Sequence, residues 1–216
     1  GIGAIPDAVL QCLKGRRDLG LHTEMFTDGV MHMIQSGHVT GEKKTLHHRK
    51  VASSIIMGSK ALYDFIDHNE MIEMYPVNHM NDPYVIGQND RMVSINSCLE
   101  IDLYGQVASE AIGLEQFSGT GGQVDYLRGA KRSRGGRSIL AFTSTTKGGT
   151  VSRIVPVLPP GATVTSGRNE VDYIATEYGA VRLRGLTLRE RALALVSIAH
   201  PDFRPGLMAA IEERFS

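Results

Sequence analysis

The strongest constraint on the fold is the alternation of strand-type and helix-type segments along the whole chain. Short apolar runs predict strands at residues 19–25, 52–58, 138–143, 151–155 and 171–175. Apolar residues three and four positions apart predict helices at residues 6–15, 28–37, 60–66, 123–130, 187–198 and 205–214. Because there is neither an internal repeat nor a low-complexity linker, we expect one α/β domain with an open, mainly parallel sheet flanked by helices.

Two further strands are expected to pair with each other. Residues 92–95 and 99–103 are apolar and flank Ser97-Cys98, a pattern that indicates paired strands around a turn. Helix starts are marked by polar residues, with Thr27 or Asp28 as one expected cap and Ser59 as another.

The charges are balanced, since 23 Lys and Arg residues stand against 23 Asp and Glu residues. No field of the whole protein would therefore gather nucleic acid or an anionic membrane. No apolar run approaches the roughly 20 residues of a membrane helix, and no basic and apolar leader precedes the first motif. We expect a cytoplasmic protein with neither a nucleic acid nor a membrane as partner.

Cysteine and histidine do not form a recognisable metal or disulfide pattern. Cys12 and Cys98 are too few for a disulfide framework, and we interpret them as buried thiols in a reducing compartment. His47-His48 lacks an acid or a Cys at metal-ligand spacing, so we interpret the pair as surface residues. The sequence predicts no metal site.

Glycine is enriched, because it makes up 24 of the 216 residues, about 11%, against roughly 7% in an average protein. Two glycine clusters, residues 1–3 and 119–122, each precede a predicted helix, whose free N–H groups favour negative charge. Each is a possible oxyanion or phosphate cradle, and a plain tight turn fits equally well. Neither has the dinucleotide-binding or P-loop spacing. Because the first cluster opens the chain without a Met, we expect that an N-terminal half is missing.

Glu24 lies where a predicted strand gives way to a helix. In open α/β sheets this end of a strand faces the crevice that binds ligands, so Glu24 is a candidate nucleophile. On its own the signal is weak, because most glutamates at strand ends are solvated or salt-bridged. His22, two residues earlier, shares a face with Glu24 without being aimed at it, and we interpret it as structural.

A basic stretch, RGAKRSRGGR, covers residues 128–137 and contains no acid. A solvated helix end and turn is the favoured interpretation, and a nucleic-acid patch or a site for a small polyphosphate are the functional alternatives. The neutral chain and the lack of interleaved aromatic residues argue against nucleic acid.

Eight segments, in chain order, resemble the C-terminal half of the acetyl-CoA hydrolase/transferase family. The likeness is greatest to its 4-hydroxybutyrate and butyrate:acetate CoA-transferase members, and it covers essentially the whole chain. The segments are GIGAIPDAVL, LGLHTEMFTDG, HMNDPYVIGQND, INSCLEIDLYGQVASE, FSGTGGQVDYLRGA, STTKGGTVSRIVP, ATEYGAVRLRGLTLRERA and IAHPDFR.

The resemblance implies a class I CoA-transferase of two similar α/β halves, of which residues 1–216 are the C-terminal catalytic domain and the N-terminal domain is absent. It implies acyl-CoA and small carboxylates as substrates, no cofactor other than CoA as substrate, and a homodimer. The implied site residues are Glu24 as nucleophile, Ile2, Gly3, Gly121 and Gly122 as backbone donors to an oxyanion or CoA, and Asn81 and Glu177 as substrate-binding or supporting groups.

Three alternatives stay open. Leakage of water to the reactive intermediates would make the protein an acyl-CoA hydrolase. The basic stretch and the glycine turns could instead hold a phosphorylated ligand without catalysis. A third possibility is a folded but inert fragment, whose uncovered apolar surface would make it dimeric. The acyl group and the acceptor carboxylate are left open.

Overall fold

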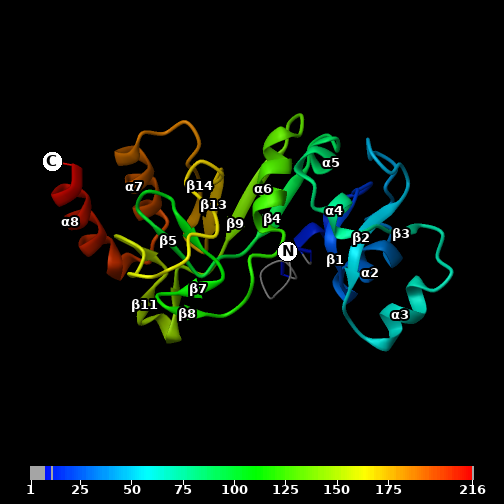
Figure 1. The fold of residues 1–216 in the computed structure, drawn as a ribbon, viewed down its shortest axis with the longest axis horizontal. Coiled ribbons are helices and arrows are strands. Elements are labelled where there is room, and N and C mark those ends of the chain that lie inside the picture. The colour runs from blue at the N-terminus through cyan, green and yellow to red at the C-terminus, as the bar shows by residue number, and fades with distance from the viewer. Residues whose placement is uncertain (1–7, 11, 216) are drawn as a thin grey trace. The chain divides into compact units, whose positions relative to one another are not determined.

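The computed structural model describes residues 8–10 and 12–215 and divides the chain into two compact units (Figure 1). The first unit comprises the chain up to Ser94 together with Arg128–Arg137. The second comprises Ile95–Leu127 together with the chain from Ser138 onward. Each unit has its own hydrophobic core.

The first unit contains a fully parallel sheet. Its strands are β1 (His22–Phe26), β2 (Val51–Ile56) and β3 (Ile72–Met74), and its helices are η1 (Leu13–Gly15), α2 (Asp28–Gln35), α3 (Lys60–Ile66), α4 (Val77–Met80) and α5 (Pro83–Gly87). The order is β1-β2-β3, and the register places His22 beside Ala52 and Ala52 beside Glu73. Helices α2 and α3 provide the crossovers that parallel strands require.

Local signals set several helix starts in this unit. Thr27, in extended backbone, is the residue before α2, and the Ser59 hydroxyl accepts a hydrogen bond from the Leu62 N–H at 3.4 Å. Pro83 occupies the first turn of α5, where its missing N–H costs nothing. The core of the unit consists of Phe26, Val30, Met31, Met33, Val39, Val51 and Leu62.

The second unit is built from several smaller sheets. The longer strands of these sheets are β4 (Val93–Asn96), β5 (Glu100–Asp102), β9 (Arg137–Ala141), β13 (Tyr173–Thr176) and β14 (Gly179–Arg182). The two-residue strands are β6 (Val107–Ala108), β7 (Ala111–Ile112), β8 (Glu115–Gln116), β10 (Thr145–Thr146), β11 (Val151–Ser152) and β12 (Ile154–Val155). The helices are α6 (Gln123–Arg132), η2 (Lys147–Gly149), α7 (Leu188–Ser197), η3 (Pro201–Phe203) and α8 (Arg204–Phe215). The chain passes between the units within β4, α6 and β9.

Two of these sheets contain a parallel pair. Strand β13 runs parallel to β9 and antiparallel to β14, and β5 runs parallel to β12 and antiparallel to β6. The expected α/β class, with mainly parallel strands flanked by helices, is confirmed, although the strands are divided among five sheets.

The expected pairing of residues 92–95 with 99–103 is wrong. Strand β4 belongs to the sheet of β9, β13 and β14, whereas β5 pairs with β12 and β6. The strand expected at 151–155 is divided at Arg153, because β11 pairs with β10 and β12 with β5. The Arg153 guanidinium donates to the Leu99 carbonyl oxygen at 2.8 Å and so ties the break to the start of β5.

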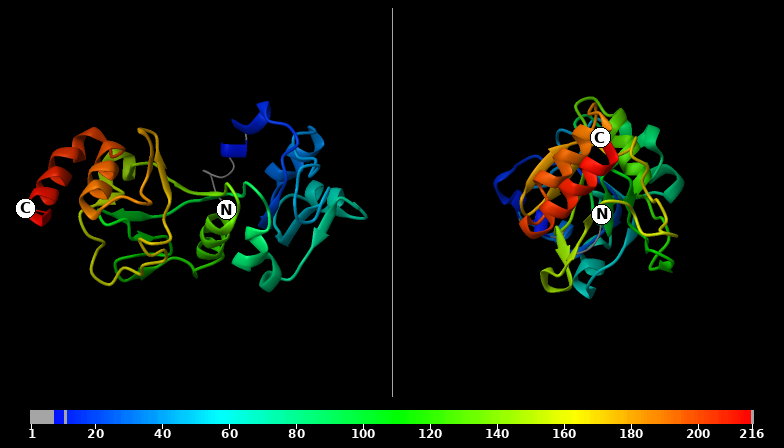
Figure 2. Two further views of the ribbon diagram at one scale, coloured as in Figure 1. Left: turned by 90° about the horizontal axis from the view of Figure 1, so that it is seen from above. Right: turned by 90° about the vertical axis from the view of Figure 1, so that its left-hand side faces the viewer.

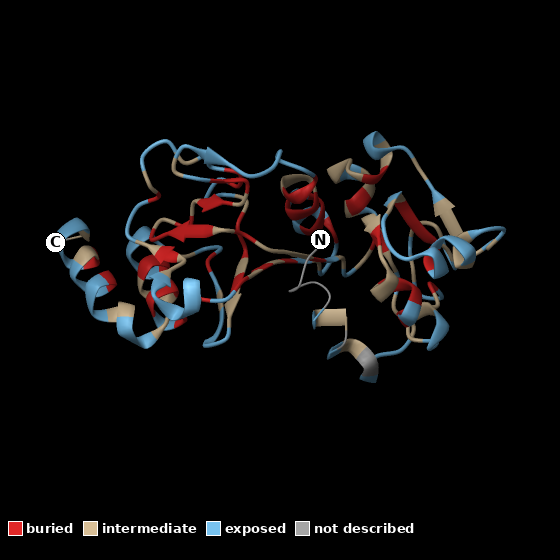
Figure 3. Ribbon diagram, turned by 90° about the horizontal axis from the view of Figure 1, so that it is seen from below, coloured by how far each residue is buried: buried red, intermediate tan, exposed pale blue. Residues whose placement is uncertain are grey.

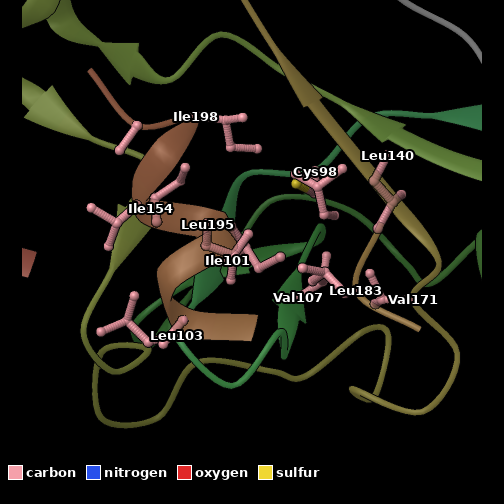
Figure 4. Close-up of a cluster of buried hydrophobic side chains, with 14 of the residues drawn as sticks. Cys98, Ile101, Leu103, Val107, Leu140, Ile154, Val171, Leu183, Leu195 and Ile198 are labelled. Atoms are coloured by element: carbon pink, nitrogen blue, oxygen red, sulfur yellow. The ribbon is translucent and has the colours of Figure 1, made fainter. Parts of the chain in front are cut away.

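The core of the second unit lies between these strands and α7, as the close-up in Figure 4 shows. Helix α8 packs beside α7 (Figure 2) and contributes Leu207 and Ile211 to the core. Figure 3 shows buried positions on the inner strands and on one side of α7, whereas most residues of α8 are exposed. A capping box between Thr187 and Glu190 starts α7.

Candidate active site

Glu24 is the middle residue of the five-residue parallel strand β1, three residues before the N-cap of α2, and not at the end of the strand as the sequence predicts. Its side chain is half-buried, and within the described residues no hydrogen bond or ion pair reaches its carboxylate. The backbone is fixed instead, because the Ser53 hydroxyl donates to the Glu24 carbonyl oxygen at 3.1 Å. The backbone of Glu24 is therefore fixed by a hydrogen bond, while its carboxylate is available to bind a substrate.

His22 connects this strand to a neighbouring helix. Its buried ring donates a hydrogen bond from Nε2 to the carbonyl oxygen of Met80, the last residue of α4, at 3.0 Å. Burial lowers the pKa of His22 to about 4, so the ring is neutral at pH 7. The contact is the one expected of a structural histidine.

Asn81 follows α4 and is its C-cap residue. Its N–H donates to the Val77 carbonyl oxygen at 2.8 Å, while its side-chain Oδ1 is buried and has no hydrogen-bond partner in the described part of the chain. Buried polar atoms are nearly always bonded, so an orphaned acceptor at a predicted site residue is consistent with a group that bonds to a ligand.

His47 is not the surface residue that we expected. Only 13% of its side chain is exposed, because the ring packs against those of Tyr75 and His79, with ring centroids 4.6 Å and 5.4 Å away. His48 is exposed, as expected. Sequence reasoning missed this cluster because it joins a loop, the end of β3 and α4, which are distant along the chain.

The hydrogen bonds of this cluster have a fixed direction. Tyr75 has one hydroxyl proton and donates it to the Glu73 Oε2 atom at 2.8 Å, so its oxygen accepts from the His47 Nδ1–H at 3.1 Å. His47 Nε2 is then an acceptor, and His79 donates from its own Nε2 at 3.2 Å. This His79–Glu73 chain attaches α4, the helix that precedes Asn81, to the sheet.

A buried amine lies next to the same sheet. Lys44 donates from Nζ to the carbonyl oxygens of Leu21, at 2.7 Å, and Lys50, at 2.9 Å. Burial lowers the pKa of this amine to about 8. The bonds fasten the loop that carries His47 to the entry of β1 and of β2.

Gly121 and Gly122 precede the N-terminus of α6 in the second unit, as the sequence predicts. Gly121 has a φ of +56°, a left-handed conformation that favours glycine, and it is exposed. Gly122 is buried, and its carbonyl oxygen accepts the Tyr126 N–H at 3.1 Å, the first turn of the helix. Gln123 anchors the turn by donating to the hydroxyls of Ser109 and Ser166.

Glu177 occupies the turn between β13 and β14. Its carboxylate accepts two hydrogen bonds from Ser144, one from the backbone N–H at 2.8 Å and one from the hydroxyl at 2.6 Å. Partial burial raises the pKa of this carboxyl, but the Ser144 bonds and its own backbone N–H outweigh that effect and lower the pKa overall. Glu177 is therefore an ionised group held in one orientation.

The predicted site residues fall into two groups. Glu24 and Asn81 belong to the first unit, whereas Gly121, Gly122 and Glu177 belong to the second. Ile2 and Gly3 lie outside the described residues. That these groups form one site stays a prediction.

Several other expectations concern residues away from this site. Cys98 is buried, and burial raises the pKa of its thiol to about 12, but Cys12 is exposed, contrary to the expectation. In the basic stretch, Arg134 forms an ion pair with Asp90, and Arg132 lies over the Tyr84 ring at 5.8 Å.

The described residues contain neither a metal-binding cluster nor a membrane-spanning helix. No group of three or more His, Cys, Asp or Glu residues in that part of the chain could hold a metal ion. Among the described helices, none has both the length and the apolar character needed to cross a membrane.

Comparison with known proteins gives consistent matches. The family model of the acetyl-CoA hydrolase/transferase C-terminal domain matches residues 58–211. The 4-hydroxybutyrate coenzyme A transferase of Clostridium kluyveri is 56% identical over 100% of this chain and 50% of its own length. A probable butyrate:acetyl-CoA coenzyme A-transferase of Syntrophomonas wolfei is 44% identical over 96% of this chain and 47% of its own.

A solved structure agrees with these relatives. The 4-hydroxybutyrate CoA-transferase of Porphyromonas gingivalis matches with a TM-score of 0.87 and 62% identity, over 99% of this chain and 50% of that one. The resemblance found in the sequence motifs is thereby confirmed. The chain spans about half the length of the curated relatives it matches.

Proposed function

Because this chain belongs to the acetyl-CoA hydrolase/transferase family, we propose that it is the C-terminal catalytic domain of a short-chain acyl-CoA:carboxylate CoA-transferase with Glu24 as nucleophile. The observation that carries the proposal is the half-buried Glu24 carboxylate, which lies on a parallel strand and receives no hydrogen bond or ion pair from the described residues. An anion in that position is available to an incoming acyl group.

The chemistry proceeds in two exchanges. The Glu24 carboxylate attacks the thioester carbonyl, the C–S bond breaks, and CoA thiolate leaves a mixed anhydride. The thiolate then attacks the Glu24 carbonyl carbon, the C–O bond breaks, and the first carboxylate departs from a glutamyl-CoA thioester. The second carboxylate runs these steps in reverse. Each step exchanges one anion for another, so no proton has to move.

A carboxylate nucleophile suits this reaction because both intermediates stay as reactive as the starting thioester, whereas a serine ester would be a thermodynamic sink. A carboxylate is also a weak nucleophile, so the barrier must be lowered by orientation and by donors to the developing oxyanion. Backbone N–H groups at Gly121 and Gly122 would supply such donors, and Asn81 and Glu177 would orient the substrate.

The substrates that we propose are 4-hydroxybutyryl-, butyryl- or acetyl-CoA as donor and a small carboxylate such as acetate as acceptor, by similarity to the named relatives. We further propose a homodimer in a reducing cytoplasm, in which CoA is a substrate and no cofactor takes part.

The test uses the full-length protein with butyryl-CoA, with and without acetate, and follows acetyl-CoA and free CoA thiol separately. A transferase forms acetyl-CoA only when acetate is present and releases little free thiol. A hydrolase releases thiol whether or not acetate is present. Glu24→Gln should abolish transfer. Glu24→Asp keeps the carboxylate on a side chain that is shorter by one methylene group, and its rate should be lower by a factor of about 10². Full activity in Glu24→Gln would overturn the proposal.

A further inference from the structure

Strand β2 carries a buried hydroxyl group that has no hydrogen-bond partner among the described residues, the Oγ of Ser54. Native proteins rarely leave such a group unbonded, because it has lost its bonds to water. The preceding residue behaves in the ordinary way, since Ser53 donates to the Glu24 carbonyl oxygen at 3.1 Å. The Ser53 hydroxyl is therefore used in a structural hydrogen bond, whereas the Ser54 hydroxyl is available to bond to another group.

The strand register places this hydroxyl beside the candidate nucleophile. Thr23 pairs with Ser53 and Met25 with Ile55, so Glu24 on β1 stands opposite Ser54 on β2. Neighbouring strands lie about 4.8 Å apart, and side chains at paired positions project from the same face of the sheet. The Ser54 and Glu24 side chains consequently project next to each other from the same face of the sheet.

The same face also receives α4. His22, two residues before Glu24, bonds to the Met80 carbonyl oxygen and holds that helix in place. The next residue, Asn81, supplies a second buried oxygen without a partner in the described part of the chain. Within the described residues, the Ser54 hydroxyl and the Asn81 Oδ1 atom are therefore two buried polar atoms without partners, one on the strand paired with that of Glu24 and one directly after the helix that His22 contacts.

We propose that Ser54 is a further catalytic residue, whose hydroxyl donates a hydrogen bond to the Glu24 carboxyl oxygen while that oxygen carries the developing negative charge. The inference rests on the proposed function. When CoA thiolate attacks the Glu24 carbonyl carbon of the anhydride, the carbonyl oxygen becomes an oxyanion until the C–O bond breaks and the acyl carboxylate leaves. A hydroxyl with no competing acceptor among the described residues can turn to that oxygen and bond it most strongly at this point.

Ser54→Ala in the full-length protein is the direct test, with kcat, KM for butyryl-CoA and the rate of CoA attachment to Glu24 measured together. Loss of one oxyanion donor typically costs about 10² to 10³ in kcat. We expect a loss of about 10² in kcat, slower formation of the Glu24 adduct and little change in KM. Ser54→Thr, which keeps the hydroxyl on a strand-compatible side chain, should restore kcat to within a few fold.

Ser138→Ala is the matched control. Ser138 is also a strand serine with a buried, unpartnered Oγ in the described chain, but it lies on β9, which belongs to a different sheet from β1 and β2. Its replacement should leave kcat unchanged. If Ser54→Ala keeps kcat within twofold, or if Ser138→Ala loses as much, the proposal is wrong.

A failure of the role proposed for Ser54 can be distinguished from a failure of the proposed CoA-transferase function. If wild type transfers CoA and Glu24→Gln does not, while Ser54→Ala resembles wild type, only the role of Ser54 fails. Should Ser54→Ala fold poorly, Ser54→Cys, which keeps the size but is a weak donor, must give a kcat well below that of wild type. A cysteine variant equal to wild type would contradict the proposal.

Discussion

The Nε2 atom of His22 donates a hydrogen bond to the carbonyl oxygen of Met80, 3.0 Å away, and so joins β1 to the last residue of α4. This bond sits between two elements of the proposed site, because Glu24 follows on the strand and Asn81 follows on the helix. The ring is buried and neutral, which makes the arrangement sensitive to acid.

Acid should destabilise the protein through His22. Burial lowers the pKa of His22 to about 4 from 6.5, so between these values the unfolded chain binds more protons than the folded one. The neutral His22 makes its full contribution to the free energy of unfolding above pH 6.5. That free energy falls by up to about 3 kcal/mol as the pH drops to 4. Urea unfolding at pH 7 and pH 5 measures this loss. His22→Gln should make the loss smaller, and an undiminished loss in that variant would be evidence against the assignment.

Tyr75→Phe should loosen α4 from the sheet. The substitution removes the hydroxyl that links His47 to the Glu73 carboxylate, and a hydrogen bond to a charged group contributes about 1.5 to 3 kcal/mol. We expect a lower urea midpoint and a lower affinity for substrate. Tyr84→Phe removes the hydroxyl of an exposed tyrosine and is the control. Equal midpoints for the two variants would show that the His79–Glu73 chain adds no stability.

Ser144→Ala should raise the pKa of Glu177. The hydroxyl and the backbone N–H of Ser144 both bond to this carboxylate and lower its pKa, and the substitution removes only the hydroxyl. Because the folded pKa is depressed, the bonds stabilise the protein above the unfolded pKa, and that contribution is lost as the pH falls through the folded pKa. Carbon NMR of labelled glutamate follows the titration. An unchanged Glu177 titration in the variant would refute the explanation.

Two glycines should respond oppositely to alanine. A Cβ at Gly129 in α6 would lie 2.4 Å from Ile86 of α5, so Gly129→Ala should cost about 1 to 3 kcal/mol by overpacking. At Gly206 in α8 a Cβ meets nothing within 4 Å, and Gly206→Ala should stabilise by up to about 1 kcal/mol. Thermal unfolding of both variants decides the matter, and a destabilised Gly206→Ala would mean that α8 is packed differently.

The features that local chemistry determines were predictable from the sequence. The start of α3 after Ser59 follows from capping preference, and the strand that carries Glu24 follows from a short apolar run, although β1 ends at Phe26 and not at Glu24. Long-range pairing did not follow, since the neighbours of β5 come from residues 154–155 and 107–108, and nothing near residue 99 encodes them. The paired-strand prediction failed for this reason.

The site shows the same division. The strand that carries Glu24 and the helix start after Gly121 are visible in the sequence pattern, whereas the place where β1 ends is not. His47 was misjudged because its partners, Tyr75 and His79, lie 28 and 32 residues away. Ser54 gave no signal at all, because its importance rests on a strand register and on a missing bond. The register and the missing bond can be recognised only once the pairing of β1 with β2 is known.

The most direct test of the account is to incubate the full-length protein with butyryl-CoA, quench and digest it, and locate covalently bound CoA by mass spectrometry. The account predicts a CoA thioester on the peptide that contains Glu24, lost on addition of acetate as acetyl-CoA forms. A CoA adduct on any other residue, or turnover with no adduct while Glu24→Gln remains active, would contradict it.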